Sequence, residues 1–245
     1  LEDNVDTLLY GEVTISRGVD MPVPAPIMPF AYAIFSPAST LPLLRGREWV
    51  QTLTYHPEAT ELVAVVAAKI VDNQRSPDPS VLTDTMNLDI DSTIDITQYV
   101  QNGHLQWNPP SDGEWQIVSI YTMPSGSRLL IAAVAEENYV VDPFDTQAIT
   151  RYYNNWIGQH PELLAHAGGT LRALFSDSYE YFAQRMFADD LIETFRANRG
   201  YDVTPFLPAV FQPARDLHFF FFTGLPTAPD FSFGELSERI IHDYN

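Results

Sequence analysis

Two carboxylate residues, Asp177 and Glu180, stand close together in the acidic run SDSYE at residues 176–180. The run follows a short apolar segment, residues 171–175, whose length favours a buried strand over a helix. The neighbours of Glu180 are the aromatic residues Tyr179, Tyr181 and Phe182. Aromatic surface excludes water from a carboxyl group, which raises its pKa and suits it to donating a proton. The alternatives are a first-turn helix residue for Glu180 and an N-cap for Asp177.

A third carboxylate, Asp142, ends the apolar pair Val140 and Val141 in the sequence VVDPFD. Like Asp177, it would follow a strand. Polar residues at the carboxyl ends of parallel strands meet at one edge of a sheet or one mouth of a barrel. The alternative is that Asp142 or Asp145 caps the helix that follows.

The segment after the acidic run has the apolar pattern of a helix over residues 188–198. Gly200 follows its last turn and is the expected C-cap. Gly168 and Gly169, which precede residues 171–175, would stop an earlier helix. Strand, acidic loop and helix in this order form the unit of an α/β sheet or barrel, in which the chemistry lies at the carboxyl ends of the strands.

Several blocks of the sequence carry a family resemblance. The first is DSYE with the FRANRGYD and TPFLPAV that follow it. The others are LQWNPPSDGEWQIVSIYTMPSG (residues 105–126), YVVDPFDTQAI (139–149) and PDFSFGELSERIIHDYN (229–245). In their order along the chain, the blocks resemble those of the family 106 glycoside hydrolases, the α-L-rhamnosidase-like enzymes. The resemblance runs, with gaps, over residues 62–245.

The resemblance implies a hydrolase that cleaves terminal α-L-rhamnosides or similar deoxy-sugar bonds with inversion. Inversion needs one carboxylic acid that protonates the leaving oxygen and a second carboxylate that activates water. By resemblance, Glu180 is the general acid and Asp177 is the catalytic residue beside it. The implied sugar-binding residues are Asp142, Ser178 and Tyr179. Pro143 stands where the family block has His, so the role of that His is absent or moved here.

The resemblance also points beyond these 245 residues. The family's general base lies in a block after the last one matched, and the family has barrel strands before the first. The chain therefore resembles an internal segment of a longer enzyme, whose other segments would be its partners. Family members are described as calcium-dependent, so Ca²⁺ is the implied cofactor, with ligands unassigned. The acidic run at residues 84–95 lacks the glycine and spacing of a calcium loop and is expected to be a solvated strand face.

The expected fold is mixed, α+β or α/β. Residues 1–134 are predicted to form a β-rich, sandwich-like region, and residues 135–245 the βα units of a partial (β/α)8 barrel that carries DSYE. The predicted strands of the first region are residues 61–71, 88–96, 115–121 and 129–134. Because of its prolines, the stretch over residues 1–50 is expected to hold loops and brief strands without a core of its own.

Two further helices are predicted in the second region. The first begins at the cap Asp145 and runs to about residue 165, with a break or kink at His160-Pro161. One of its faces carries Ile149, Tyr152, Tyr153 and Trp156. The second covers residues 234–244.

Composition narrows the function classes. The chain has 13 basic and 32 acidic residues, a net charge of −19, which argues against nucleic acid and against an anionic membrane surface. An acidic surface suits a neutral oligosaccharide or glycoside, and solubility alone would also explain it. The absence of Cys excludes disulfides and thiolate catalysis. No signal peptide is visible and the chain opens with Leu1, so we expect a mature or trimmed product of a secreted, extracellular protein.

Two other hypotheses remain open at this stage. One is a non-catalytic carbohydrate-binding or inactive relative, which keeps an aromatic pocket without a paired base. That pocket would contain Trp107, Trp115, Tyr179 and Tyr181. A carboxylate about 6.5–9.5 Å from Glu180 would favour the enzyme, since an inverting pair needs room for water. The other is an α+β scaffold in which each candidate has only a capping or surface role.

Overall fold

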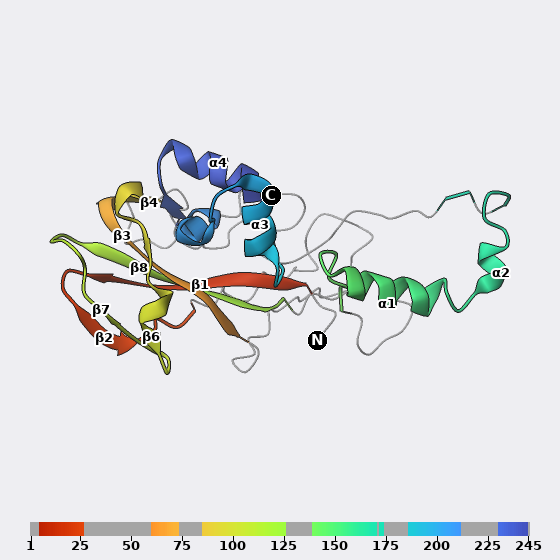
Figure 1. Ribbon diagram of the computed structural model, residues 1–245, viewed down its shortest axis with the longest axis horizontal. Coiled ribbons are helices and arrows are strands. Elements are labelled where there is room, and N and C mark those ends of the chain that lie inside the picture. Colours follow the sequence, from red (N-terminus) through yellow and green to blue (C-terminus); the bar gives the residue numbers. More distant parts are fainter. Residues whose placement is uncertain are drawn as a thin grey trace, which may run out of the picture.

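The computed structural model describes residues 5–26, 60–73, 85–125, 139–170, 172–173, 186–211 and 230–244. Within these residues the main feature is a seven-stranded sheet, ordered β10-β4-β3-β8-β1-β9, with β5 paired to β3. Its strands are β1 (Asp6–Ile15), β3 (Glu61–Asn73), β4 (Thr85–Leu88), β5 (Ile94–Asp95), β8 (Trp115–Pro124), β9 (Met186–Phe187) and β10 (Asp230–Ser232). Figure 1 shows helices against this sheet and a helical arm that extends away from it.

The centre of the sheet is formed by β1, β8 and β3. Strand β8 pairs antiparallel with β1 along its whole length, from Asp6 opposite Pro124 to Ile15 opposite Trp115, and with β3 on its other side. Almost every residue of β8 is buried, because both faces of this strand are covered. The predicted strands at residues 61–71 and 115–121 are therefore confirmed.

Strand β1 corrects the expectation for residues 1–50, which had no long strand. Its ten residues lie next to β8 in the sheet, and Leu8, Leu9 and Tyr10 are buried. The prolines of this region begin only at Pro22, so nothing in the preceding sequence opposes a strand.

The strand predicted over residues 88–96 is interrupted. After β4 the chain forms the 3₁₀ helix η3 (Ile90–Ser92), then β5, then the 3₁₀ helix η4 (Thr97–Tyr99). A carboxylate oxygen of Asp89 accepts a hydrogen bond from the backbone N–H of Asp91 at 3.2 Å. Asp side chains that bond to nearby backbone in this way compete with the strand ladder. The acidic run thus forms turns rather than a continuous strand face.

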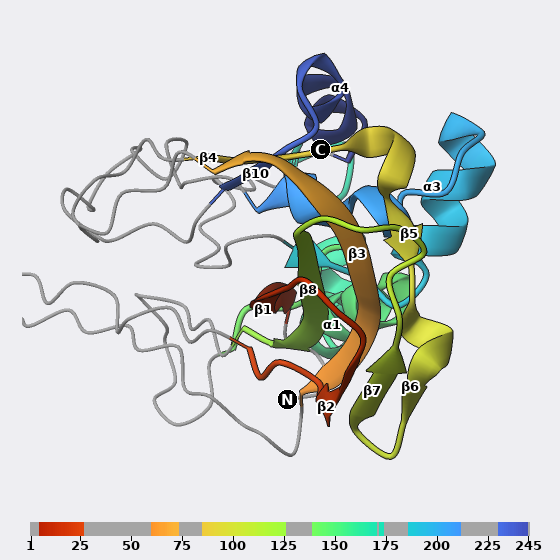
Figure 2. The same ribbon diagram turned by 90° about the vertical axis from the view of Figure 1, so that its left-hand side faces the viewer.

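A second, three-stranded sheet has the order β2-β7-β6. Its strands are β2 (Val19–Pro22), β6 (Val100–Gln101) and β7 (His104–Trp107). Figure 2 shows that β3 and β8 are strongly curved, so that the main sheet curls. The fold is a mixed α+β fold built around a curled sheet.

Residues from both halves of the sequence build the larger hydrophobic core. Leu8 and Val118 contribute from the sheet, Phe195 from helix α3 (Leu191–Arg199) and Ile240 from helix α4 (Glu235–Tyr244). The 3₁₀ helix η5 (Thr204–Val210) adds its buried last turn. A smaller core on the other side of β3 and β8 contains Trp107, Trp115 and Ile117.

The two C-terminal helices agree with the predicted ones. Helix α3 begins three residues later than predicted, and Gly200 is its C-cap in the left-handed conformation, with φ of 79°. Helix α4 lies within the predicted residues 234–244. The hydroxyl of Tyr201 donates to a carboxylate oxygen of Asp243 at 3.1 Å, which ties the end of α3 to α4.

The arm consists of helix α1 (Thr146–Trp156) and helix α2 (Pro161–Leu164) (Figure 1). The Asp145 carboxylate accepts from the N–H of Gln147 at 2.7 Å and is the N-cap, as predicted. Helix α1 ends at Trp156 instead of continuing to residue 165, and the chain breaks at His160-Pro161 as expected. Only Ala148 of α1 is buried.

The partial (β/α)8 barrel is not confirmed. Among the described residues, the parallel pairing is that of β10 with β4, and the other pairs are antiparallel. The predicted strands over residues 129–134 and 171–175 lie outside the described residues apart from residues 172–173. None of the described helices is long and apolar enough to cross a membrane.

Candidate active site

Asp142 is the predicted site residue that the structure describes. It lies at the base of the arm, shortly before α1, and is only 8% exposed. One carboxylate oxygen accepts from the N–H of Phe144 at 2.8 Å. Burial raises the pKa of Asp142, and the N–H groups of Phe144 and Asp145 oppose that rise. Since Asp145 caps α1, Asp142 is not the helix cap, and its role in sugar binding stays a prediction.

Asp6, the first residue of β1, was not among the predicted site residues. Burial raises its pKa from 3.8 to about 6, and the nearby charges of Asp189, Asp142 and Glu61 add to the rise. Among the described residues no Lys or Arg forms an ion pair with Asp6. Its carboxyl group therefore takes up a proton at mildly acidic pH, in the range that suits a proton donor.

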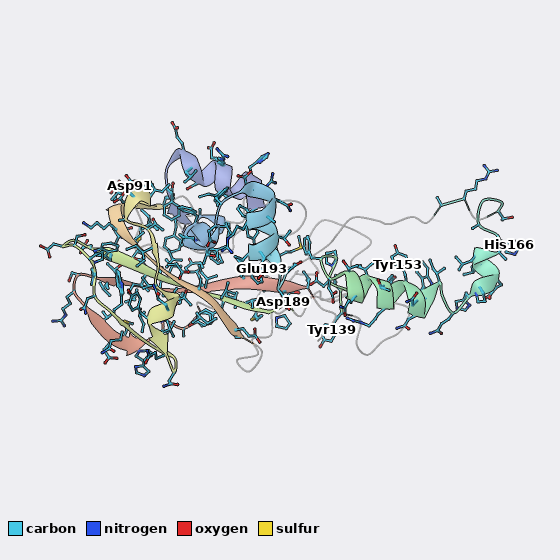
Figure 3. All side chains as sticks on the ribbon, in the orientation of Figure 1. Asp91, Tyr139, Tyr153, His166, Asp189 and Glu193 are labelled. Carbon is cyan, nitrogen blue, oxygen red and sulfur yellow. The ribbon has the colours of Figure 1, made fainter. Side chains whose placement is uncertain are left out.

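Four carboxylates from separate segments thus influence one another at one end of the sheet. We call Asp6, Glu61, Asp142 and Asp189 the carboxylate cluster. Glu61 begins β3, and Asp189 stands in the turn before α3. Figure 3 shows Asp189 beside the end of β1, with Tyr139 at the start of the arm nearby. Asp6 and Glu61 begin strands, and Asp142 follows a short extended segment. An acidic residue at the end of an apolar run was therefore the sequence signal that could have pointed to them.

The DSYE residues Asp177, Ser178, Tyr179 and Glu180 lie outside the described residues. The described chain resumes at β9, which pairs with the beginning of β1, so that Phe187 lies opposite Asp6 and Met186 opposite Thr7. The segment that follows the block in sequence is thereby held against the carboxylate cluster. The roles predicted for the four block residues stay predictions.

The described residues alone do not fit a metal site. No group of three His, Asp or Glu side chains among them is arranged to hold an ion. The members of the carboxylate cluster influence one another's charge, yet they are not gathered as ligands of one ion would be. The calcium expected by family resemblance stays a prediction.

The prediction that Trp107 and Trp115 line an aromatic pocket is wrong. Trp107 is 6% exposed and Trp115 is 1% exposed, and their rings pack edge to face with centroids 5.4 Å apart. They belong to the smaller hydrophobic core, because the alternation of β7 and β8 turns them inward. Glu193 and Glu235 lie on the exposed sides of their helices, away from the described cores.

Comparison with known proteins identifies the family. The family model described as alpha-L-rhamnosidase, glycoside hydrolase family 106, matches residues 61–212, which is more than half of the chain. The chain belongs to this family. The matched residues of this family 106 protein include Glu61, Asp142, the DSYE block and Asp189, while Asp6 precedes them.

The fold is also similar to a solved structure, that of a rhamnosidase from Novosphingobium sp. PP1Y, with a TM-score of 0.52 and 16% sequence identity. The match covers 99% of this chain and 34% of that one, so the family 106 chain spans about a third of the length of that rhamnosidase. At this identity the likeness concerns the fold. No match was found among curated proteins.

Proposed function

We propose that this protein is part of a glycoside hydrolase of the α-L-rhamnosidase type that acts on terminal α-L-rhamnosides or similar deoxy-sugar links. The observation that carries the proposal is the family match over residues 61–212, because it spans Asp142 and the DSYE block together. The similar fold of a solved rhamnosidase supports it. The glycoside substrate is neutral, which agrees with a chain of net charge −19.

The carboxylate cluster supports this proposal, because its environment favours protonated carboxyl groups. An inverting glycosidase needs a protonated carboxyl group and carboxylates that bind the sugar or activate water. The environment around Asp6 and Asp142 raises the pKa of both groups through burial. Any further carboxyl group brought next to this cluster would experience the same repulsion between negative charges, which favours its protonated, proton-donating form.

The roles of individual residues follow from the family resemblance. We assign Glu180 as the general acid that protonates the leaving oxygen, with Asp177 beside it. Asp142, Ser178 and Tyr179 would hold the sugar hydroxyls. The general base would come from a segment beyond these 245 residues, in an extracellular enzyme whose catalytic region continues as a (β/α)8 barrel.

The test is Glu180→Gln in the longest natural form of the protein. A general acid matters most when the leaving group is poor, so hydrolysis of a rhamnosyl disaccharide should fall at least about 100-fold. Hydrolysis of 4-nitrophenyl α-L-rhamnoside, whose leaving group needs little protonation, should fall much less. Glu193→Gln, on the exposed side of α3, is the matched control. Full activity of Glu180→Gln on the disaccharide would refute the assignment.

The stereochemical proposal has its own test. Inversion of an α-L-rhamnoside releases β-L-rhamnose first, which mutarotates only later. Proton NMR during the first minutes of hydrolysis distinguishes the two anomers. If the α anomer appears first, the mechanism is retaining and the proposed role of a water-activating base is wrong.

A further inference from the structure

A buried hydroxyl group without a partner lies at the carboxylate cluster. Thr122 on β8 is 7% exposed, and its Oγ1 has no hydrogen-bond partner in the described part of the structure. A buried hydroxyl that forms no hydrogen bond destabilises the folded state, so native proteins usually satisfy such groups through protein, water or ligand. A valine of nearly the same shape would avoid this cost, so the presence of Thr122 suggests that its hydroxyl group has a partner that binds there.

The strand register places this hydroxyl next to two members of the carboxylate cluster, Glu61 and Asp6. Thr122 lies directly opposite Glu61 on β3 and opposite Leu8 on β1. Asp6, two residues before Leu8, points to the same face because side chains alternate along a strand. Glu61 faces Thr122 directly from β3, whereas Asp6, opposite Pro124 on the β1 side, is a diagonal neighbour of Thr122 at about 7–8 Å. The charge of Glu61 also contributes to the raised pKa of Asp6, as expected for two carboxylates at the same end of the sheet.

The groups around this space define what could bind there. Carboxylates accept hydrogen bonds, and a threonine hydroxyl both donates and accepts. No Lys or Arg among the described residues forms an ion pair with Asp6 or Glu61, and the described carboxylates are not arranged to hold a metal ion. Leu8 and Phe187 on the same face belong to the larger hydrophobic core and offer no polar group. A neutral ligand that is rich in hydroxyl donors matches this set of groups.

We propose that Asp6, Glu61 and Thr122 form a subsite that binds the hydroxyl groups of a neutral sugar, adjacent to Asp142. This inference rests on the proposed function for the class of sugar. It adds to the predicted site three residues of the main sheet, Asp6 on β1, Glu61 on β3 and Thr122 on β8, none of which belongs to the DSYE or VVDPFD blocks. The subsite binds and orients the sugar, and no bond is made or broken there.

The chain offers a matched control for Thr122. Thr7 on β1 is fully buried, and its Oγ1 also lacks a partner in the described structure. Thr7 lies opposite Met123 and Met186, on the other face of the same strand pair, away from the Asp6 and Glu61 side chains. Replacement of either threonine by Val removes an unpaired hydroxyl with little change in shape. Only the change at Thr122 should affect a ligand bound between Asp6 and Glu61.

The experiment is titration of the protein with L-rhamnose, followed by isothermal calorimetry or NMR, for the wild type, Thr122→Val, Asp6→Asn and Thr7→Val. We expect Thr122→Val and Asp6→Asn to raise the Kd about five-fold or more, as loss of one hydrogen bond does, and Thr7→Val to leave it unchanged. Thermal unfolding of each variant checks that it is folded. Thr122→Val should be at least as stable as the wild type, because it removes an unsatisfied group.

The outcomes separate this inference from the proposed function. If the wild type binds L-rhamnose and folded Thr122→Val binds equally well, the subsite is wrong and the hydrolase proposal stands. If Thr122→Val loses affinity but the wild type hydrolyses no rhamnoside, the subsite stands and the catalytic proposal fails. If the folded wild type binds no rhamnose, the subsite is overturned, and hydrolysis of the rhamnosyl disaccharide alone decides the hydrolase proposal.

Discussion

Asp6 on β1 lies directly opposite Phe187 on β9, the two-residue strand that follows the DSYE block in the chain. This pairing holds the beginning of the described chain against a segment some 180 residues later in sequence. Asp142, at the base of the arm, influences the same carboxyl group. Three distant parts of the sequence thereby meet at one end of the curled sheet, which is where the chain's described carboxylates with raised pKa values lie.

Asp6→Asn should make the protein more stable, and the gain should depend on pH. The pKa of Asp6 is about 6 in the folded state against 3.8 for the free side chain, so ionisation opposes folding. The stability present below pH 3.8 is lost as pH rises to about 6. The gap in pKa corresponds to about 3 kcal/mol, and solvent screening at this half-buried group reduces it to about 1 kcal/mol. Urea denaturation at pH 4 and pH 7.5 measures the effect.

The control for this prediction is Asp91→Asn. Asp91 is exposed and lies far from the carboxylate cluster (Figure 3). Its replacement should leave the pH profile of the unfolding free energy like that of the wild type. An equal gain for Asp6→Asn at pH 4 and pH 7.5 would contradict the raised pKa of Asp6.

Gly11→Ala should destabilise the protein because no space exists for a Cβ atom at this position of β1. The added atom would meet the backbone carbonyl oxygen of Ala25, and that of Pro24 at 2.6 Å. This backbone cannot easily move, since the Ser119 hydroxyl donates to the Pro24 oxygen at 2.6 Å and the Tyr121 hydroxyl donates to it at 2.9 Å. We expect a loss of about 1–3 kcal/mol in the free energy of unfolding.

Gly169→Ala is the matched substitution for Gly11→Ala. At Gly169 the nearest atom to a new Cβ would be the carbonyl oxygen of His166 at 3.6 Å, an ordinary contact. Its thermal midpoint should therefore stay close to that of the wild type. A folded Gly11→Ala protein with an unchanged midpoint would show that residues 24–25 do not pack against β1 as described.

Gly200→Ala should lower stability by about 1 kcal/mol, because Gly200 ends α3 with φ of 79°. Asn adopts this left-handed conformation more readily than Ala, so Gly200→Asn should recover part of the loss. Chemical denaturation of the two variants side by side measures the difference. If Ala and Asn lower stability equally, backbone conformation is not the cause.

Local sequence patterns predicted the elements whose signal lies within a few residues. Continuous apolar runs located β3 and β8, the helical spacing of apolar residues located α3, and Asp145 and Gly200 were recognised as caps. Such features follow from backbone preferences and short-range contacts. Strand β1 was not predicted. The prolines after residue 21 argue against regular structure, and that argument was extended to the proline-free residues before them.

The carboxylate cluster could be predicted only in part. Asp142 was found because it ends an apolar pair and lies in a family block. Asp6 and Glu61 carry only the weak local signal of standing at a strand end. Their proximity depends on the register of β1, β8 and β3, which pairs β1 with residues of β8 that lie 100–118 positions later and β3 with residues of β8 that lie 46–61 positions later. Register is set by packing over the whole sheet, and a single sequence does not reveal it.

Trp115 and Trp156 should respond in opposite ways to truncation. Trp115 is 1% exposed, packs against Trp107, and its Nε1 donates to the Ser111 carbonyl oxygen at 3.1 Å. Trp115→Ala should lower the free energy of unfolding by about 3–5 kcal/mol, because it leaves a cavity in the smaller core. Trp156 is 48% exposed at the end of α1, so Trp156→Ala should change it by no more than about 0.5 kcal/mol.

Fluorescence gives an independent check on the same pair. Acrylamide reaches an exposed indole and not one in a close-packed core, so Trp156→Phe should remove a strongly quenched component of the emission while Trp115→Phe removes a protected one. If Trp156→Ala instead destabilises the protein by several kcal/mol, and its indole is protected from acrylamide, then α1 packs against other polypeptide in solution. In that case the exposed arm would be wrong, and the aromatic face of α1 would be part of a core.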